Sequence, residues 1–359
     1  MAQLISRLCT HEGEENGRMK KLFACMLMLC MMVVMAGCGG SQSAPEKSGG
    51  KEPIKVSLGM LRLTSSAPLF IAMEKGYFKE EGIEIDPQWF DAAQPIAVAT
   101  ASSKVDVGAT GISASLYNMA AKGQKLYIVA DKGREEKGYS SSALLANTDA
   151  YAGGLNSIEA LKGKRIGITQ KGSTFEYMAG RLLESKGLSN DDVTLVPLGK
   201  ISAVMAALQS GQIDACILNE PNVSKVQREG YGKLITQVSD VIPYQTSAVF
   251  YSPNFAEKKD AGIRFMKAYN KACQYYYEAV VEKKDPARLD EIVKIIAKHV
   301  KTPEEDIKLG LPYIDKNGVL LASDIDTQIQ WYKSHGLIDG NLKGSDVVNG
   351  SFLEEAMKK

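Results

Sequence analysis

Histidine and cysteine are scarce in this sequence of 359 residues, and neither sign of charge dominates. The 43 Lys and Arg residues balance 42 Asp and Glu residues, beside three histidines and six cysteines. Without a basic stripe there is no electrostatic footprint for nucleic acid, so we expect no nucleic-acid partner. His11, His299 and His335 are far apart, and no His or Cys pair has the spacing of metal ligands. We therefore expect neither a metal site nor a cofactor.

The N-terminal segment MKKLFACMLMLCMMVVMAGCGG places an apolar run between two lysines and Cys38. The run is about fifteen residues long, which is short for a membrane span. With the small residues before Cys38, it resembles a bacterial lipoprotein signal, which is cut before the cysteine so that the thiol receives a lipid. A short transmembrane anchor is the alternative. Residues 1–18 are polar, and Met19 is an alternative start to Met1.

Residues 38–53 are predicted to be a lipidated, flexible tether. Gly39–Pro53 is rich in Gly, Ser, Pro and Lys and has no large apolar side chain to bury. Once the signal is removed and Cys38 is lipidated, Cys216 and Cys273 are the remaining cysteines. We expect them to be two buried free thiols rather than a disulfide.

Strands and helices alternate in the next part of the chain, which predicts βαβ units and a mostly parallel sheet. The predicted strands are 54–60, 83–90, 105–110 and 125–131, and the predicted helices are 67–76, 95–103 and 112–123.

The pattern then restarts. The second run has predicted strands at 161–169, 193–199, 213–219 and 233–238, and predicted helices at 173–187, 202–211 and 221–230. Asp106 in KVDVGATG matches Asp214 in QIDACILNE, which suggests two similar lobes, with chance similarity as the alternative.

The last part of the chain is mainly helical. After a predicted strand at 247–255, helices are predicted at 262–282, 286–300, 303–311 and 323–335. The fold class is therefore α/β with two lobes and a ligand cleft between them. The predicted division is 1–37 signal, 38–53 tether, 54–140 plus 248–359 lobe I, and 141–247 lobe II.

Several stretches together resemble a known family: the lipoprotein signal, APLFIAMEKGYFKEEGIEI, LKGKRIGITQKGST and ALQSGQIDACILNEP. They are similar to the extracytoplasmic substrate-binding proteins of ABC importers. Within this family, the resemblance is to the nitrate/sulfonate/taurine and thiamine-pyrimidine-precursor type. The resemblance covers Ile54 to Glu282. It implies the type II two-lobed periplasmic-binding-protein fold, with the C-terminal helices on the first lobe. It also implies delivery of a small solute to a permease and its ATPase.

The same fold class includes a pyrimidine-precursor synthase that consumes its own histidine and uses a Cys-rich cluster. This sequence has no Cys cluster, and His299 and His335 stand in the helical tail. No nucleophile–base pair or paired carboxylates occur together in the predicted cleft loops. We therefore expect a binding protein rather than an enzyme. A receptor that reports its ligand to a signalling partner is the alternative within the binding class.

On the first lobe, the loop LRLTSSAP between the first strand and helix offers polar groups to a ligand. Thr64, Ser65 and Ser66 carry hydroxyls, and Arg62 could pair with a carboxylate or sulfonate. The plainer alternative is that Ser66 caps the helix and Arg62 faces solvent.

Other candidates on this lobe follow later strands. Gly111 allows close backbone approach and Ser113 is a cap or donor. Trp89 could stack on a flat ligand or lie in the core, beside Phe90 and Asp91. Lys132 could meet an anion or lie in a solvated loop.

On the second lobe, QKGSTFE joins a strand to a helix. Gly172 is followed directly by Ser173 without the lysine of a phosphate-binding P-loop, so a nucleotide site is not expected. Ser173 and Glu176 match a capping box, which leaves Gly172, Thr174 and free backbone N–H groups for a ligand. All three of Gly172, Ser173 and Thr174 are kept as ligand-site candidates.

The motif LNEP ends a predicted buried strand of the second lobe and adds Asn219 and Glu220. Glu220 could accept hydrogen bonds from an amine, an amino-heterocycle or the other lobe; the alternative is a carboxylate at a helix N-terminus. The sequence thus predicts a monomeric solute-binding lipoprotein outside the cytoplasm, anchored through Cys38. Its solute is a sulfonate or carboxylate anion or a pyrimidine-like heterocycle.

Overall fold

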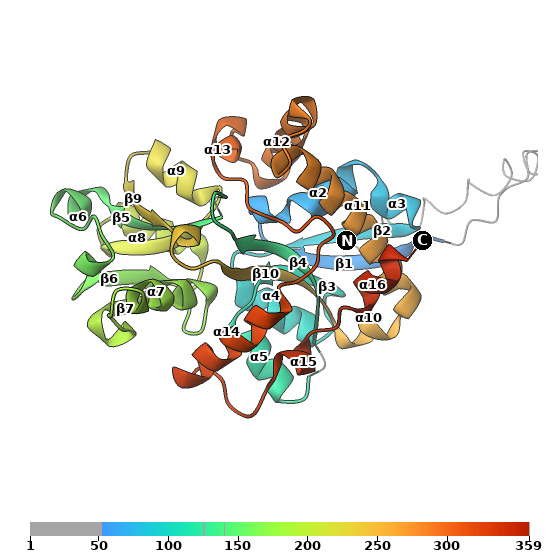
Figure 1. Ribbon diagram of the computed structural model, residues 1–359, viewed down its shortest axis with the longest axis horizontal. Coiled ribbons are helices and arrows are strands. Elements are labelled where there is room, and N and C mark those ends of the chain that lie inside the picture. Colours follow the sequence, from blue (N-terminus) through green and yellow to red (C-terminus); the bar gives the residue numbers. More distant parts are fainter. Residues whose placement is uncertain (1–51, 125, 140, 359) are drawn as a thin grey trace, which may run out of the picture. The chain divides into compact units, whose positions relative to one another are not determined.

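The computed structural model describes residues 52–124, 126–139 and 141–358. The predicted signal, Cys38 and most of the tether lie outside these residues. The described chain forms two five-stranded sheets, one of which runs in the order β2-β1-β3-β10-β4 and the other in the order β7-β6-β8-β5-β9. We call the first sheet and the helices on it the first lobe, and the second sheet with its helices the second lobe (Figure 1).

The strands overlap their predicted positions, except for the strand at Ser142–Asn147, which was not predicted. Those of the first sheet are β1 (Ile54–Met60), β2 (Ile83–Trp89), β3 (Val107–Gly111), β4 (Tyr127–Glu135) and β10 (Tyr244–Tyr251). Those of the second are β5 (Ser142–Asn147), β6 (Arg165–Ile168), β7 (Thr194–Pro197), β8 (Ala215–Asn219) and β9 (Gly232–Gln237).

The two sheets share one topology. β1 is parallel to β2 and β3, while β10 is antiparallel to both of its neighbours. In the second sheet β6 and β5 take the same places, since β6 is parallel to β7 and β8 and β5 is antiparallel to β8 and β9.

The matched aspartates stand at corresponding points of the two lobes. Asp106 accepts a hydrogen bond from the backbone N–H of Ser57, and Asp214 from that of Arg165, at 2.9 and 2.8 Å. Each pair is separated by 49 residues, so the similarity between the two runs is structural and not a chance match.

The helices surround the sheets. They are α2 (Ala67–Glu74), α3 (Tyr77–Glu80), α4 (Ala93–Ala101), α5 (Ala114–Ala121), α6 (Thr148–Ala152), α7 (Thr174–Glu184), α8 (Ile201–Gln209), α9 (Asn222–Arg228), α10 (Pro253–Glu257), α11 (Lys259–Val280), α12 (Pro286–Val300), α13 (Glu304–Leu309), α14 (Ala322–Ser334), α15 (Gly344–Val347) and α16 (Ser351–Met357). In Figure 1, α9 and α13 lie next to each other above the sheets, and α14 lies below them.

Local sequence explains the helix ends. The Asp285 side chain accepts from the N–H of Arg288 at 2.9 Å and Pro286 takes the first helical position, so α12 begins where such signals predict. Ile292, Val293 and Ile296 are fully buried on its inner face. A prediction failed at β10, which ends at Tyr251, because the Ser252 side chain caps α10 instead of continuing the strand.

An aromatic cluster joins α14 to both lobes. Tyr332 of α14 lies 6.0 Å from Tyr117 of α5 and 5.4 Å from Tyr177 of α7, measured between ring centroids. Tyr177 also contacts Tyr244 at the start of β10, at 5.0 Å. The C-terminal helices therefore do not pack on the first lobe alone, because α14 also covers part of the second.

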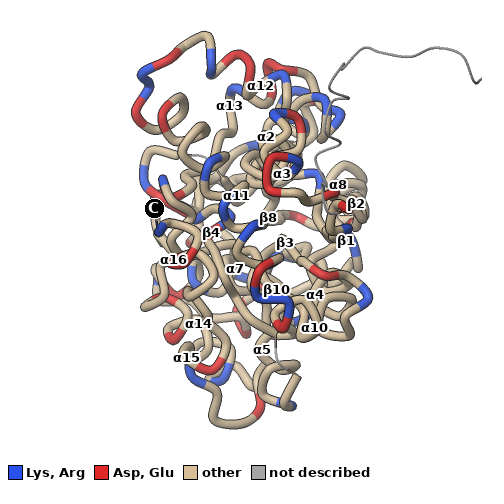
Figure 2. Tube along the Cα trace, turned by 90° about the vertical axis from the view of Figure 1, so that its right-hand side faces the viewer, with Lys and Arg blue, Asp and Glu red and all other residues tan. Residues whose placement is uncertain are grey.

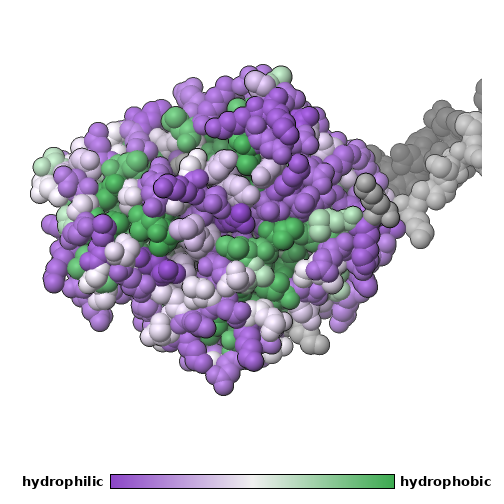
Figure 3. All heavy atoms as spheres, in the orientation of Figure 1, coloured by the Kyte–Doolittle hydropathy of each residue, from purple (hydrophilic) through white to green (hydrophobic). Residues whose placement is uncertain are grey.

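Surface charge and hydropathy are mixed in the described part of the chain. Figure 2 shows Lys and Arg interspersed with Asp and Glu along the trace, and Figure 3 shows apolar residues in separate patches on a mostly hydrophilic face. Within the described residues, none of the helices combines the length and hydropathy needed to cross a membrane. Cys216 and Cys273 are buried free thiols, as predicted.

Candidate functional site

A cavity of about 30 Å³, which we call the inner cavity, lies between the lobes. Its wall includes the carboxyl ends of parallel strands from both sheets, where ligands of such folds bind. The residues that line it are Leu61, Leu63, Ser65, Ala92, Ala93, Thr110, Gly111, Lys132, Ser141, Thr169, Thr174, Phe175, Ile201, Asn219, Thr246 and Ser247. Among the described residues, hydroxyl and amide groups from both lobes therefore converge on one small volume, together with one ammonium group, that of Lys132.

Lys132 is the charged side chain that lines this cavity. It is fully buried, and its Nζ donates to the Ser65 hydroxyl at 2.8 Å. Burial lowers its pKa from 10.5 to about 7, because the ammonium loses its water, while the nearby Asp131 acts in the opposite direction. The polar sequence around Lys132 suggested a loop, but β4 continues through it to Glu135.

Asp131 does not neutralise Lys132 by a direct ion pair. Its carboxylate accepts from the N–H groups of Gly133 and Asp315 at 2.7 and 2.8 Å, and from the Gln245 amide at 2.6 Å. Among the described residues, no carboxylate forms an ion pair with Lys132. The ammonium is thus held at the cavity wall with a neutral hydroxyl as its hydrogen-bond partner.

A second buried titratable group stands near the point where the chain passes between the sheets. Glu135 Oε1 accepts from the Ser142 and Thr246 hydroxyls at 2.5 and 3.4 Å. Asn219 donates to the same Ser142 hydroxyl at 2.8 Å, which links Glu135 to the cavity wall. Burial raises the pKa of Glu135 from 4.5 to about 7, against the lowering effect of these hydrogen bonds.

These two shifts predict that the ligand-free protein has a minimum of stability near pH 7. Glu135 binds its proton more tightly when folded, so its contribution is full below pH 4.5 and is lost as pH rises to about 7. Lys132 binds its proton less tightly when folded, so stability is regained as pH rises from about 7 to 10.5. Melting temperatures measured across this range should show the dip. The double variant Glu135→Gln/Lys132→Met should lack it, and an equal dip in that variant would contradict the assignment.

Some of the predicted first-lobe residues line the inner cavity and others do not. Ser65 and Gly111 do. Thr64 instead donates through its backbone N–H to the carbonyl of Glu220 in the second lobe, at 3.2 Å. Ser66 donates to the Leu61 carbonyl at 3.2 Å, so its hydroxyl neither reaches the cavity nor caps α2. The Ser113 hydroxyl pairs with that of Ser115 at 2.9 Å.

Arg62 and Trp89 lie together outside the inner cavity. The Arg62 guanidinium stacks over the Trp89 ring, 3.9 Å from its centroid, and donates to the carbonyl of His299. Trp89 and His299 also pack beside Phe70. Arg62 therefore covers a face of the ring of Trp89, the residue that was predicted as a possible stacking partner for a flat ligand.

The turn QKGST is divided between a helix cap and the cavity. Ser173 Oγ accepts from the N–H of Glu176 at 3.3 Å, as the capping box predicts. The Glu176 carboxylate, however, accepts from the N–H of Gly172 at 2.6 Å and not from that of Ser173. The N–H of Gly172 is thus used inside the second lobe, and its carbonyl accepts from Ala114 of the first lobe at 2.9 Å. Thr174 is the residue of this turn that lines the cavity.

The LNEP motif is divided in the same way. Asn219 lines the inner cavity. The Glu220 carboxylate accepts from the N–H of Ser224 at 3.0 Å, and its Cγ and Cδ would stand 2.2 Å from a Cβ placed on Gly310. Glu220 therefore belongs to the contact between the lobes and not to the cavity wall.

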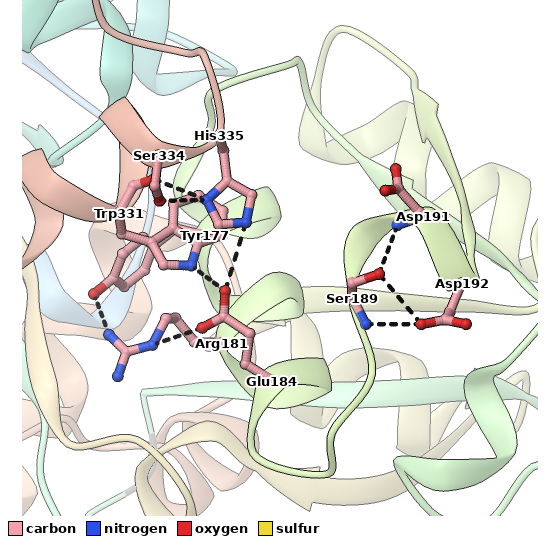
Figure 4. Close-up of polar contacts among 9 residues, drawn as sticks. All are labelled: Tyr177, Arg181, Glu184, Ser189, Asp191, Asp192, Trp331, Ser334 and His335. Carbon is pink, nitrogen blue, oxygen red and sulfur yellow. Dashed lines mark hydrogen bonds and ion pairs between the residues drawn. The ribbon is translucent and has the colours of Figure 1, made fainter.

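A second contact between the lobes is made by α14 on α7 (Figure 4). Trp331 Nε1 donates to Glu184 at 2.7 Å, and His335 Nε2 lies 3.5 Å from the same carboxylate oxygen. The Arg181 guanidinium donates a hydrogen bond to the Tyr177 hydroxyl at 2.7 Å, and its Nε lies 3.4 Å from Glu184 Oε2. With the Glu220 contact, the lobes touch at separate places, so the structure has the closed arrangement of the cleft.

Sequence reasoning missed several residues of the cavity wall. Thr169 directly follows β6, so the rule that ligands gather at strand ends was enough to find it. Thr246 and Ser247 lie inside β10 and reach the cavity only because β10 pairs between β3 and β4. No sequence pattern marks that pairing.

The paired sheets of shared topology, with a polar cavity enclosed between them, define the two-lobed periplasmic-binding-protein fold. The NMT1/THI5-like family matches residues 63–282, more than half of the chain. The chain belongs to this family, in agreement with the resemblance seen in the sequence.

Relatives agree with a solute-binding role, and a solved structure shares the fold. The chain is 25% identical to the putative aliphatic sulfonates-binding protein of Bacillus subtilis, over 93% of this chain and 96% of the relative. It is 29% identical to the nitrate/nitrite binding protein NrtA of Synechococcus elongatus, over 83% and 74% of the two chains. The fold matches the alkanesulfonate-binding protein SsuA of Xanthomonas axonopodis pv. citri, with a TM-score of 0.68, 20% identity and coverage of 83% and 99%.

A shorter match is to an enzyme. The 4-amino-5-hydroxymethyl-2-methylpyrimidine phosphate synthase of Aspergillus parasiticus is 30% identical over 45% of this chain and 44% of its own length. That segment is less than half of either protein, whereas the matches to binding proteins extend over most of this chain.

Proposed function

We propose that this protein is the solute-binding lipoprotein of an ABC importer. It captures one small organic anion between its lobes and passes it, unchanged, to the membrane permease and its ATPase. The observation that carries this proposal is Lys132, a buried ammonium that faces hydroxyl and amide groups of both lobes and has no carboxylate of the described residues in hydrogen-bond contact. A bound anion would supply the missing charge in a site from which water is excluded.

An anion is a better candidate than a flat amino-heterocycle. Two of the features that favoured the heterocycle are used elsewhere, since Arg62 covers the Trp89 face and Glu220 packs against the first lobe near Gly310. Among the described residues, the charge that remains in the wall of the inner cavity is the positive charge of Lys132. The names of the sulfonate- and nitrate-binding relatives support the same choice, and a sulfonate or carboxylate is the class we propose.

We propose that the permease recognises the closed, ligand-bound form of the protein. An anion that contacts Lys132 of the first lobe and Thr174 or Asn219 of the second favours the closed arrangement over the open one. The lipid on Cys38 would keep the monomer outside the cytoplasm and next to the membrane. A receptor role would use the same closure, and loss of solute uptake on deletion of the gene would favour transport.

A thermal-shift panel on the protein from Gly39 onward tests the proposed class. Short sulfonates and carboxylates should raise the melting temperature, since a ligand at 100 times its Kd adds about 2.7 kcal/mol to the free energy of unfolding. Aminopyrimidines serve as the contrasting set. A shift with aminopyrimidines alone would contradict the proposal, and mass spectrometry that finds the bound compound altered would favour an enzyme instead.

A further inference from the structure

A second cavity, of about 230 Å³, opens at the mouth of the cleft, and we call it the outer cavity. Three apolar residues, Leu61, Leu63 and Ile201, line both the outer and the inner cavity. The backbone N–H of Ile201 donates to the Asp91 carbonyl across the lobes at 3.3 Å, beside this shared wall. The two cavities are therefore neighbouring chambers of one cleft, separated by aliphatic side chains.

The inner cavity by itself holds little. A volume of about 30 Å³ accommodates roughly two water-sized groups. The outer cavity has several times this room. A longer extension of a solute whose head group lies against Lys132 would find space in the outer cavity, past the aliphatic wall that the two cavities share.

Opposite walls of the outer cavity carry one cation each. Arg62 comes from the first lobe and Lys225 from α9 of the second. Within the described part of the chain, neither side chain forms an ion pair. The guanidinium of Arg62 is held in place by the Trp89 ring and the His299 carbonyl, which occupy only part of its N–H groups.

Asp91 is the carboxylate that lines this cavity, and it is exposed. Its single charge does not balance two cations, and it forms no ion pair among the described residues. Closure of the lobes thus brings Arg62 and Lys225 to one cavity with a net positive charge. Like charges that approach in a partly enclosed space disfavour closure, whereas an anion between them favours it.

We infer that the solute carries a second anionic group, which binds in the outer cavity between Arg62 and Lys225 while the first lies against Lys132. The inference rests on the proposed function and narrows its ligand class. The class is a short organic dianion, such as a sulfonate with a terminal carboxylate, whose methylene spacer passes Leu61, Leu63 and Ile201. Arg62 and Lys225 are then specificity-determining residues, because only a solute with a second anionic group can bind them while its first group lies against Lys132.

The test compares ligands that differ only in the terminal charge. Propane-1-sulfonate is paired with 3-sulfopropanoate, and pentanoate with glutarate, and each Kd is measured by calorimetry at an ionic strength of about 0.15 M, where long-range attraction is screened within about 8 Å. We expect the dianion of at least one pair to bind at least about tenfold tighter than its monoanion. In Lys225→Gln and in Arg62→Gln this ratio should fall below about threefold.

Lys233→Gln is the matched control, since Lys233 is an exposed lysine of the second lobe that lines neither cavity. It removes the same charge from the same lobe and should keep the native ratio. Equal Kd values within each pair, or a ratio that Lys225→Gln and Lys233→Gln change equally, would overturn the inference and leave the proposed function standing. If none of the four anions binds, the anionic class itself fails and the inference fails with it.

Discussion

Lys132→Met is expected to weaken binding of an anionic solute by about 100-fold without unfolding the protein. Loss of one partner from a buried, hydrogen-bonded charge pair costs about 2–5 kcal/mol, which is about 30-fold or more in Kd. Methionine keeps an unbranched apolar stem of similar volume, so the cavity wall stays filled. Because Lys132 is fully buried, its removal also relieves a desolvation cost, and the melting temperature of the ligand-free variant should not fall.

The pH dependence of binding separates the charge of Lys132 from a mere packing role. With its pKa lowered to about 7 by burial, the free protein carries this charge fully only below that pH. Affinity should therefore be nearly constant below pH 6 and fall by about tenfold per unit well above pH 7. Lys104→Met, an exposed lysine changed in the same way, should show the native profile. Native affinity in Lys132→Met, or an unchanged profile in that variant, would mean that the ammonium does not meet the ligand.

The course of the chain could be predicted because each element carries its own signals. Asp285 and Pro286 mark the start of α12, and alternating apolar residues mark β1, so local sequence and fold agree there. The failures have equally local causes. Ser252 and Pro253 are a cap and a first helical residue that stood inside a run of strand-forming residues. A solvated loop was one of two alternatives for the polar end of β4, yet pairing with β10 buries it.

The cleft wall could be predicted only as a set of loops. Ser65 and Thr64 are adjacent in one polar loop, and nothing in the sequence tells which of them reaches the cavity. Side-chain direction there depends on the opposite lobe, since the Thr64 hydroxyl donates to the carbonyl of Glu220 at 3.4 Å. Lys132 was recognised as a candidate for an anion, but its burial follows from the pairing of β4 and not from its neighbours in sequence.

The contacts between the lobes were the features that the sequence predicted least well. α14 packs on α5 and β10 of the first lobe, as expected, but its Trp331 also packs on α7 so closely that a Cβ on Gly180 would lie 2.4 Å from its ring. A glycine in the middle of a predicted helix gives no indication of such a partner 150 or so residues away. The closed arrangement thus depends on small residues whose role appears only when both lobes are seen together.

Gly310→Ala should hold the lobes apart and thereby weaken binding of any solute that requires closure. Gly310 follows α13, and a Cβ at this position would stand 2.2 Å from Cγ and Cδ of Glu220 in the second lobe. Glu220 cannot simply turn aside, because its carboxylate accepts from the N–H of Ser224 at 3.0 Å. Overpacking of this kind costs about 1–3 kcal/mol, which corresponds to about 5- to 150-fold in Kd when the closed form is the one that binds.

The backbone of Gly310 does not itself forbid alanine, since its φ of −135° lies in an ordinary region. The expected loss of affinity therefore arises from the contact between the lobes and not from strain within the chain. Gly350→Ala is the control, because its Cβ would meet only a Glu354 carboxylate oxygen at 3.4 Å. Small-angle scattering with saturating ligand should show a larger radius of gyration for Gly310→Ala than for Gly350→Ala. If both variants close and bind alike, the contact between Gly310 and Glu220 does not govern closure.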